Sequence, residues 1–190
     1  LVGAGLPQVR GQLGNAKSYA ERLFDFPEIG ALTKEAATQA IEKPLHDEGV
    51  NITPAALQEI LRVSQGYAYF LQTWGSHTWL AAEASPITLA DVMKGSVTAL
   101  AALDEGFFRV RFDRCTPKEK KYLRARAELG EGPHRSGDIA DVLGEKVSSL
   151  APTRSTLIHK GMVWSPNHGD TAFTVPMFGA FMQRILKDWR

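Results

Sequence analysis

The residues of this 190-residue chain that are best suited to contact a polyanion lie near its C-terminus. Over residues 148–161, a rotation of 100° per residue places Leu150, Leu157 and Ile158 on one side of a helix. The other side carries mainly small hydroxyl and ring side chains, namely Ser148, Ser149, Pro152, Ser155, Thr156 and His159. Thr153 and Lys160 lie at the edge of this side. Small hydroxyl groups beside a cation can approach base edges and bind phosphates.

Basic residues near this helix and a polar turn after it supply further candidate contacts. The candidate DNA-contacting residues are Lys118, Lys120, Lys121, Arg124, Arg135, Ser149, Thr156, His159, Lys160, Asn167 and His168. The four-residue spacing of Lys120 and Arg124 puts them on one helix face, as a phosphate-binding rail would require. A solvated surface position is the alternative for each cation. Arg154 falls beside Leu150 instead, and we expect it to pair with an acid such as Asp138 or Asp141.

Other chemistry is not supported by the sequence. The five histidines lack metal-ligand spacing with one another or with Cys115, so no metal site is expected, and Cys115 is expected to be a small buried residue. There is no G-x-x-x-x-G-K-[ST] loop for phosphates, and no apolar run ends in paired acids for Mg²⁺. We therefore expect this polypeptide not to be an enzyme and to hold no cofactor of its own.

Composition places the chain among globular proteins. Hydrophobic residues make up 44% and charged residues 23% of it, and no apolar run is long enough to cross a bilayer. One cysteine fits a reducing cytoplasm. Residues 109–190 hold 15 Lys and Arg against 9 Asp and Glu, whereas residues 1–108 hold 7 against 12. This asymmetry favours a C-terminal module that meets a polyanion.

Helical patterns dominate the first half. A short helix is expected within residues 11–26, another over 33–45 with Pro44 at its end, and a third over 53–66 with Thr53 as its cap. The third helix should bury a stripe that consists of Leu57, Ile60 and Leu61. Further helices are expected over 67–84 and 88–103, which together predict a small bundle.

The second half predicts a different arrangement. Three helices are expected over 116–130, 136–144 and 148–161, with Ser136 as the cap of the second. Two strands, 162–166 and 171–176, are joined by a turn, and a closing helix covers 177–189. The predicted fold class is mainly α: a helical lid bundle followed by a winged helix-turn-helix domain with a small β-hairpin wing.

Four stretches, in this order, resemble the C-terminal half of a prokaryotic AAA+/STAND-type ATPase related to archaeal ATPases and origin-recognition initiators. They are "GAGLPQV", "SYAERLFDF", "SQGYAYFLQTWG" and the stretch from "TPKEKKYLRARAELG" to "FTVPMF". The resemblance implies three parts: the end of a nucleotide-binding domain over residues 1–30, a helical lid over 31–108 and a winged helix over 109–190. It also implies that the phosphate-binding loop, ATP and Mg²⁺ belong to a longer parent chain.

The resemblance assigns candidate roles to residues outside the winged helix. Arg22 stands where the family places an arginine finger; the alternative is an ion pair with Glu21 or Asp25 on an exposed helix end. Gly66 and Tyr67 stand at the entry to the lid helix, where the family has an arginine that this chain lacks. Tyr67 would then contact nucleotide by stacking, or would be part of the core.

Two functions follow from this resemblance. In the first, the winged helix of an ATP-dependent cytoplasmic protein binds DNA. In the second, it is a protein-interaction or autoinhibitory module of the ATPase. The partners implied are DNA, the nucleotide-binding domain of the same parent chain and further copies in a homo-oligomer, with no membrane. A stand-alone transcription regulator is a third, weaker alternative, since it would leave the helical unit without a purpose.

Overall fold

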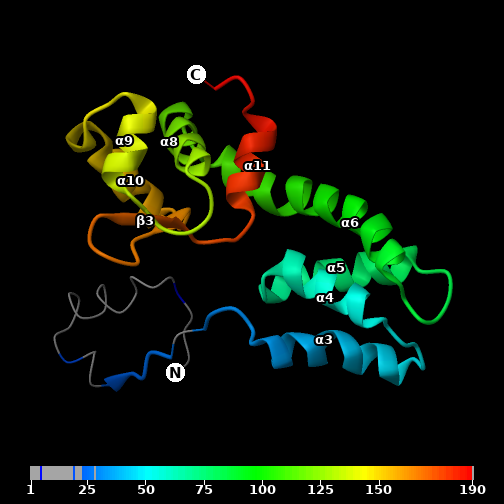
Figure 1. Cartoon of the computed structure of the whole chain (residues 1–190). Coiled ribbons are helices and arrows are strands. Elements are labelled where there is room, and N and C mark those ends of the chain that lie inside the picture. Colours follow the sequence, from blue (N-terminus) through cyan, green and yellow to red (C-terminus); the bar gives the residue numbers. More distant parts are fainter. Residues whose placement is uncertain (1–4, 6–18, 20–22, 28, 190) are drawn as a thin grey trace. The chain divides into compact units, whose positions relative to one another are not determined.

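A computed structural model describes residues 5, 19, 23–27 and 29–189 of the chain (Figure 1). It divides into two compact units, one that covers Gly30–Arg114 and one that contains Cys115–Arg190. The break between them follows Arg114, whereas the sequence-based boundary at residue 108 lies within a helical segment of the first unit. The helix expected within residues 11–26, like Arg22, falls almost wholly outside the described residues.

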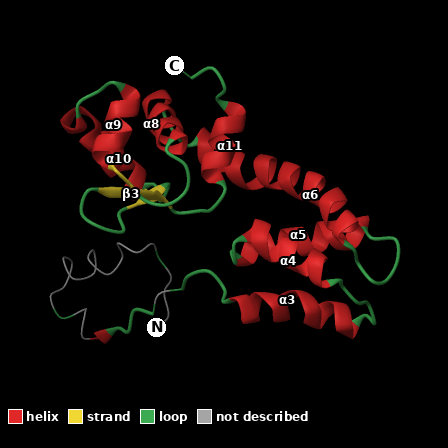
Figure 2. Cartoon of the chain, viewed as in Figure 1, coloured by secondary structure: helices red, strands yellow, loops and turns green. Residues whose placement is uncertain are grey.

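The first unit is entirely helical among its described elements (Figure 2). Its elements are α3 (Lys34–Asp47), α4 (Pro54–Ser64), α5 (Ala68–Ala81), α6 (Leu89–Leu103), the π-helical turn η1 (Asp104–Phe108) and α7 (Arg109–Asp113). Threonines begin three of these helices, because the hydroxyl groups of Thr33, Thr53 and Thr88 accept hydrogen bonds from backbone N–H groups of the first turn.

Pro44 does not end α3, contrary to the prediction. The helix continues through Pro44 to Asp47, and the carbonyl oxygen of Pro44 accepts a hydrogen bond from the backbone nitrogen of Glu48 at 3.2 Å. Proline removes only its own N–H group from the ladder, so the carbonyl of Ala40 loses its helical donor. Ala40 is exposed, and water can therefore replace that donor.

The core of this unit lies between α4, α5 and α6. Phe70, Leu71 and Trp74 of α5 are each no more than 2% exposed. Helices α5 and α6 cross closely at Gly95, where a Cβ atom would lie 2.8 Å from the carbonyl oxygen of His77.

The buried stripe predicted for α4 is only partly correct. Ile60 is buried, but Leu57 and Leu61 are half-buried, and the buried line runs through Ala56 and Ser64 instead.

The second unit combines four helices with a small sheet (Figures 1 and 2). Its elements are α8 (Pro117–Glu128), β1 (His134–Arg135), α9 (Ser136–Leu143), α10 (Val147–His159), β2 (Val163–Trp164), β3 (Asp170–Phe173) and α11 (Phe178–Ile185). The sheet is antiparallel with the order β1-β3-β2; Arg135 pairs with Asp170, and Trp164 pairs with Ala172. Three helices followed by a hairpin form a winged helix-turn-helix, so the predicted fold class is confirmed. Strand β1 was not predicted.

Local signals fix most helix ends in this unit. Thr116 and Glu119 form the capping box of α8, and Gly144 ends α9 in the left-handed region at φ 66°. Ser136 is not the cap of α9, contrary to the prediction. Arg135 occupies that position, and Ser136 is the first helical residue, whose hydroxyl donates to the carbonyl of Gly169 at 2.9 Å.

Helix α8 lies at the centre of the second unit. Its residues 122–127 are all buried, whereas an amphipathic surface helix would expose one side over these positions. Helices α9, α10 and α11 all pack against it, and Phe178 and Phe181 of α11 are buried with it. The hairpin and the helix-turn-helix are therefore held by one helix.

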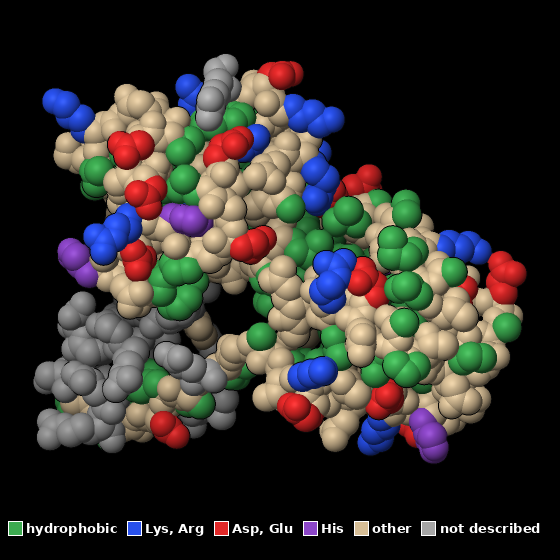
Figure 3. All heavy atoms as spheres, in the orientation of Figure 1, with side chains coloured by type: hydrophobic (Ala, Val, Ile, Leu, Met, Phe, Trp, Pro, Cys, Tyr) green, Lys and Arg blue, Asp and Glu red, His purple; other side chains and the backbone are tan. Residues whose placement is uncertain are grey.

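The surface of the chain is mixed (Figure 3). On the visible face of the winged-helix unit, Lys and Arg side chains alternate with Asp and Glu. On the helical unit, apolar side chains gather over α6, where Leu89, Met93 and Val97 are exposed at a spacing of four. Across the described part of the chain, no helix has the length and apolar character that a membrane span requires.

Candidate nucleic-acid interface

Helix α10 separates into the two sides that its sequence predicted. Leu150 and Leu157 are buried, whereas the hydroxyl-bearing side is exposed along its length. Thr153, expected at the flank, is buried as well. The third helix of the winged-helix unit thus turns a surface of small polar side chains toward solvent, the position from which recognition helices enter the major groove.

The hydroxyl groups of Ser149 and Thr156 are already engaged. Ser149 donates to the carbonyl of Lys146 at 2.8 Å or to Oε2 of Glu145 at 3.1 Å, and Thr156 donates to the carbonyl of Pro152 at 3.0 Å. Each hydroxyl has one proton, so these residues can accept a hydrogen bond from a base but must rotate to donate to phosphate.

Arg154 joins α10 to the wing by hydrogen bonds. Its guanidinium donates to Oγ1 of Thr171 at 2.8 Å, to Oγ of Ser165 at 2.7 Å and to the carbonyl of Asp170 at 2.6 Å. The inward direction expected for Arg154 is therefore correct, but the expected partners, Asp138 and Asp141, are wrong. Three oxygens of the hairpin form a better match for a planar guanidinium than one carboxylate on α9.

Lys160, expected at the DNA-facing surface, pairs with an acid of α8 instead. Its Nζ donates to Oε2 of Glu119 at 2.7 Å, and its side chain is 27% exposed. Burial alone would raise the pKa of the Glu119 carboxyl. Hydrogen bonds from Lys160 and from the backbone and hydroxyl of Thr116 outweigh burial, so the pKa lies below its usual value.

The wing presents Asn167 and His168 at its tip. Both side chains are exposed, and the turn is closed by Gly169 at φ 82°. Nδ2 of Asn167 donates to Oδ2 of Asp170 at 3.0 Å, which places a carboxylate beside the tip. His168 is thus better placed than Asn167 to approach a phosphate.

The set of exposed basic residues is smaller than predicted. Lys118, Lys121 and Arg135 are exposed and Lys120 is half-buried, but Arg124 is only 6% exposed. The guanidinium of Arg124 donates to the carbonyl of Leu186 at 2.9 Å, forms an ion pair with Glu128 and lies over the Trp189 ring. The predicted rail of Lys120 and Arg124 is therefore wrong, because α11 and the residues after it cover that face of α8.

Three residues at α10 belong to the candidate interface but were not among the predicted contacts. Lys146 is exposed and immediately precedes the first turn, and Ser148 and Ser155 are exposed hydroxyls without a hydrogen-bond partner among the described residues. Both serines were on the outward side of the helical projection, and the basic residue before the helix start was visible in the sequence. Exposed acids also lie near, at Asp138, Asp141 and Glu145.

Gly66 and Tyr67 lie in the helical unit. Gly66 has φ 70°, and a Cβ atom there would lie 2.8 Å from the carbonyl of Leu32, so packing alone requires a glycine. The half-buried Tyr67 ring packs against Phe70 with centroids 4.7 Å apart, and against Phe107 at 6.3 Å. Both residues thus have a structural role, whether or not they also contact nucleotide.

Cys115 is buried, as expected. Within the described residues, no three His, Cys, Asp or Glu side chains come together as metal ligands would.

Comparisons with known proteins cover different parts of the chain. Residues 105–182 match the family model of a domain of unknown function, DUF8462. No curated protein matches the chain. Among solved structures, a point mutant of RuvB from Thermotoga maritima matches with 20% identity and a TM-score of 0.40, over 76% of this chain and 47% of that one. The chain thus spans about half the length of that protein.

Proposed function

We propose that the winged-helix unit binds duplex DNA through the exposed side of α10, with the wing as a second contact. The observation that supports this most is the composition of that side. The sequence of α10 contains no Asp or Glu, and its exposed surface consists of small side chains that allow close approach to a groove.

The contacts divide into two kinds. Lys146 and Ser148 lie at the N-terminus of α10, where recognition helices contact base edges and where the helix dipole favours phosphate. The exposed cations Lys118, Lys121 and Arg135 supply contacts that do not depend on sequence. Arg154, the arginine of α10, is bonded to the wing, and Lys160 is bonded to Glu119. Neither side chain is therefore placed to read guanine. We therefore propose binding that tolerates many sequences.

The wider role belongs to the same proposal. The four stretches that resemble AAA+/STAND-type ATPases suggest that this chain is the C-terminal portion of a prokaryotic, cytoplasmic, ATP-dependent DNA-binding protein. In that protein, ATP and Mg²⁺ would be held by an upstream nucleotide-binding domain, and this portion alone would not hydrolyse ATP. Addition of the 190-residue chain to ATP and Mg²⁺ should therefore release no phosphate above buffer.

Fluorescence anisotropy with a labelled duplex tests DNA binding by the 190-residue chain. Ser155→Glu, on the exposed side of α10, should weaken binding at least about tenfold through repulsion from phosphate. Lys187→Ala, after α11, lowers the net charge by the same amount and should change the affinity less than about threefold. Equal losses for the two variants would contradict a contact surface on α10.

A second function is favoured by one observation. Arg154 of α10 and Lys160 at its C-cap are engaged inside the unit, and three exposed acids, Asp138, Asp141 and Glu145, precede the helix in the chain. Val147 and Trp164 are exposed apolar side chains. Such a surface also suits a protein partner. In this alternative, the winged helix docks on the nucleotide-binding domain of the parent chain. Pull-down with that domain, in competition with duplex DNA, distinguishes the two functions.

A further inference from the structure

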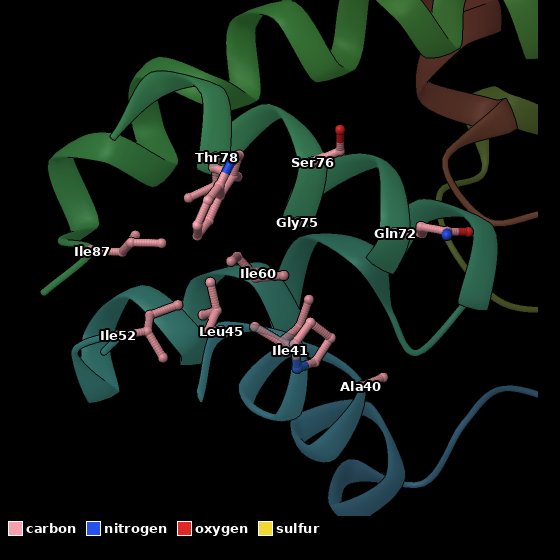
Figure 4. Close-up of a pocket in the computed structure, with 12 residues that line it drawn as sticks. Ala40, Ile41, Leu45, Ile52, Ile60, Gln72, Gly75, Ser76, Thr78 and Ile87 are labelled. Carbon is pink, nitrogen blue, oxygen red and sulfur yellow. The ribbon is translucent and has the colours of Figure 1, made fainter. Parts of the chain in front are cut away.

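A cavity of about 300 Å³ lies within the helical unit (Figure 4). Helices α3, α4 and α5 form its walls, and Ile52 and Ile87, which pair in an isolated parallel bridge, close one end. All of these residues belong to the unit Gly30–Arg114, and none belongs to the winged-helix unit. The cavity is therefore a feature of the helical bundle itself.

The cavity has an apolar floor and an accessible rim. Ile41, Leu45 and Ile60 are buried side chains that point into it, whereas Gln72 and Ser76 on the rim are exposed. A small molecule can therefore reach the floor from solvent. The volume of the cavity is at the lower limit of the range that holds small-molecule ligands.

Gly75 helps to form this space. It lies in the middle of α5 and lines the cavity, and a Cβ atom added to it would lie 3.1 Å from Cδ1 of Ile41. Glycine is unfavourable inside a helix relative to alanine. Its presence here keeps α3 and α5 close while the space between their side chains stays open.

Thr78 is the buried polar residue of the cavity lining, whereas Gln72, Ser76 and Trp79 are exposed. It is 1% exposed, it lines the cavity, and its hydroxyl has no hydrogen-bond partner among the described residues. Neighbouring hydroxyls behave differently: Thr73 donates to the carbonyl of Tyr69 at 2.8 Å, and Ser96 donates to that of Val92 at 2.7 Å. A buried hydroxyl without a partner is unfavourable. The Thr78 oxygen has almost no exposed surface, so its side chain would rotate to meet a ligand that supplies a partner, and such a ligand would bind with a gain.

The lining restricts what such a ligand can be. All twelve residues around the cavity are uncharged. An anion or a cation would lose its hydration without gaining a counter-charge. We propose that this cavity is a binding site for a small uncharged amphiphile, an apolar chain or ring with one hydroxyl group that bonds to Thr78.

Titration calorimetry with 1-octanol tests this site in the 190-residue chain, with octanoate as the charged counterpart of the same length. Octanol should bind at one site per chain, and octanoate should bind at least about tenfold more weakly because its carboxylate loses hydration. The replacement Thr78→Val keeps the side-chain shape and should weaken octanol binding about three- to tenfold. The same variant should unfold at a higher temperature without ligand, because it removes the unpartnered hydroxyl.

Thr73→Val is the matched control, since it removes a hydroxyl from the same helix outside the cavity. It should leave octanol binding unchanged. Absence of octanol binding, equal affinities for octanol and octanoate, or equal effects of the two valine variants would overturn the proposal. An ordered water bound to Thr78 that octanol does not displace would overturn it too.

Discussion

Lys160, at the C-terminal cap of α10, donates to the carboxylate of Glu119 in the first turn of α8 at 2.7 Å. The same carboxylate oxygen accepts a hydrogen bond from the backbone nitrogen of Thr116 at 2.7 Å. The Glu119 side chain is only 5% exposed. One carboxylate therefore caps α8 and joins it to the helix that we propose contacts DNA.

This pair predicts how the stability of the winged-helix unit depends on pH. The folded-state pKa of Glu119 is depressed, so its contribution is fully present above its unfolded-state pKa near 4.5 and is lost as pH falls through the lower folded-state value. At neutral pH, Glu119→Gln should therefore lower the free energy of unfolding by about 2 kcal/mol. Urea unfolding at about pH 7 and about pH 3 should show that this deficit shrinks in acid. A deficit that is equal at both pH values would contradict the role of Glu119.

A second prediction concerns Arg154. Its three hydrogen bonds to the wing are lost in Arg154→Ala, which should lower the free energy of unfolding by about 2 kcal/mol. Urea denaturation followed by circular dichroism measures this change. Lys146→Ala removes an exposed cation next to the same helix and should change stability by less than about 0.5 kcal/mol. A reversed order of the two variants would mean that Arg154 does not hold the wing.

A third prediction concerns Arg126, a cation that is 2% exposed. Its guanidinium donates to the carbonyl oxygens of Thr171, Gly130 and Gly132, and burial lowers its pKa from the usual value. Arg126→Met would leave these carbonyls without a donor, at a cost of about 3 kcal/mol or more.

Thermal unfolding compares Arg126→Met with the exposed matched change Arg135→Met, which should shift the melting temperature little. Equal shifts for the two variants would show that the carbonyl contacts do not stabilise the unit.

Local sequence signals predicted much of the fold. The capping box of Thr116 and Glu119, the stop at Gly144 and the two sides of α10 each depend on residues a few positions apart. The hairpin was likewise visible as two alternating strands around a polar turn. These features need only local geometry, and they were sufficient to predict a winged helix.

Contacts between residues far apart in the chain determine which cations are buried and where the third strand forms, and local sequence patterns do not reveal these contacts. The sequence of α8 predicts a basic surface helix, yet Arg124 and Arg126 are buried because carbonyl groups 62 and 45 residues further along the chain accept their hydrogen bonds. Strand β1 has two residues and exists only because β3 pairs with it. The candidate interface in the structure therefore includes Lys146 and excludes Arg124, because the packing of the folded chain determines which cations are exposed.

The salt dependence of duplex binding tests the central proposal most directly. If Lys118, Lys121, Arg135 and Lys146 supply three or four phosphate contacts, affinity should fall about 40- to 150-fold between about 50 and 200 mM salt. Anisotropy titrations of the 190-residue chain at these two concentrations measure the change. Such a fall, reduced when Lys146 is replaced by alanine, is the result we predict. No binding at the lower salt concentration, or an affinity that is the same at both concentrations, would contradict it.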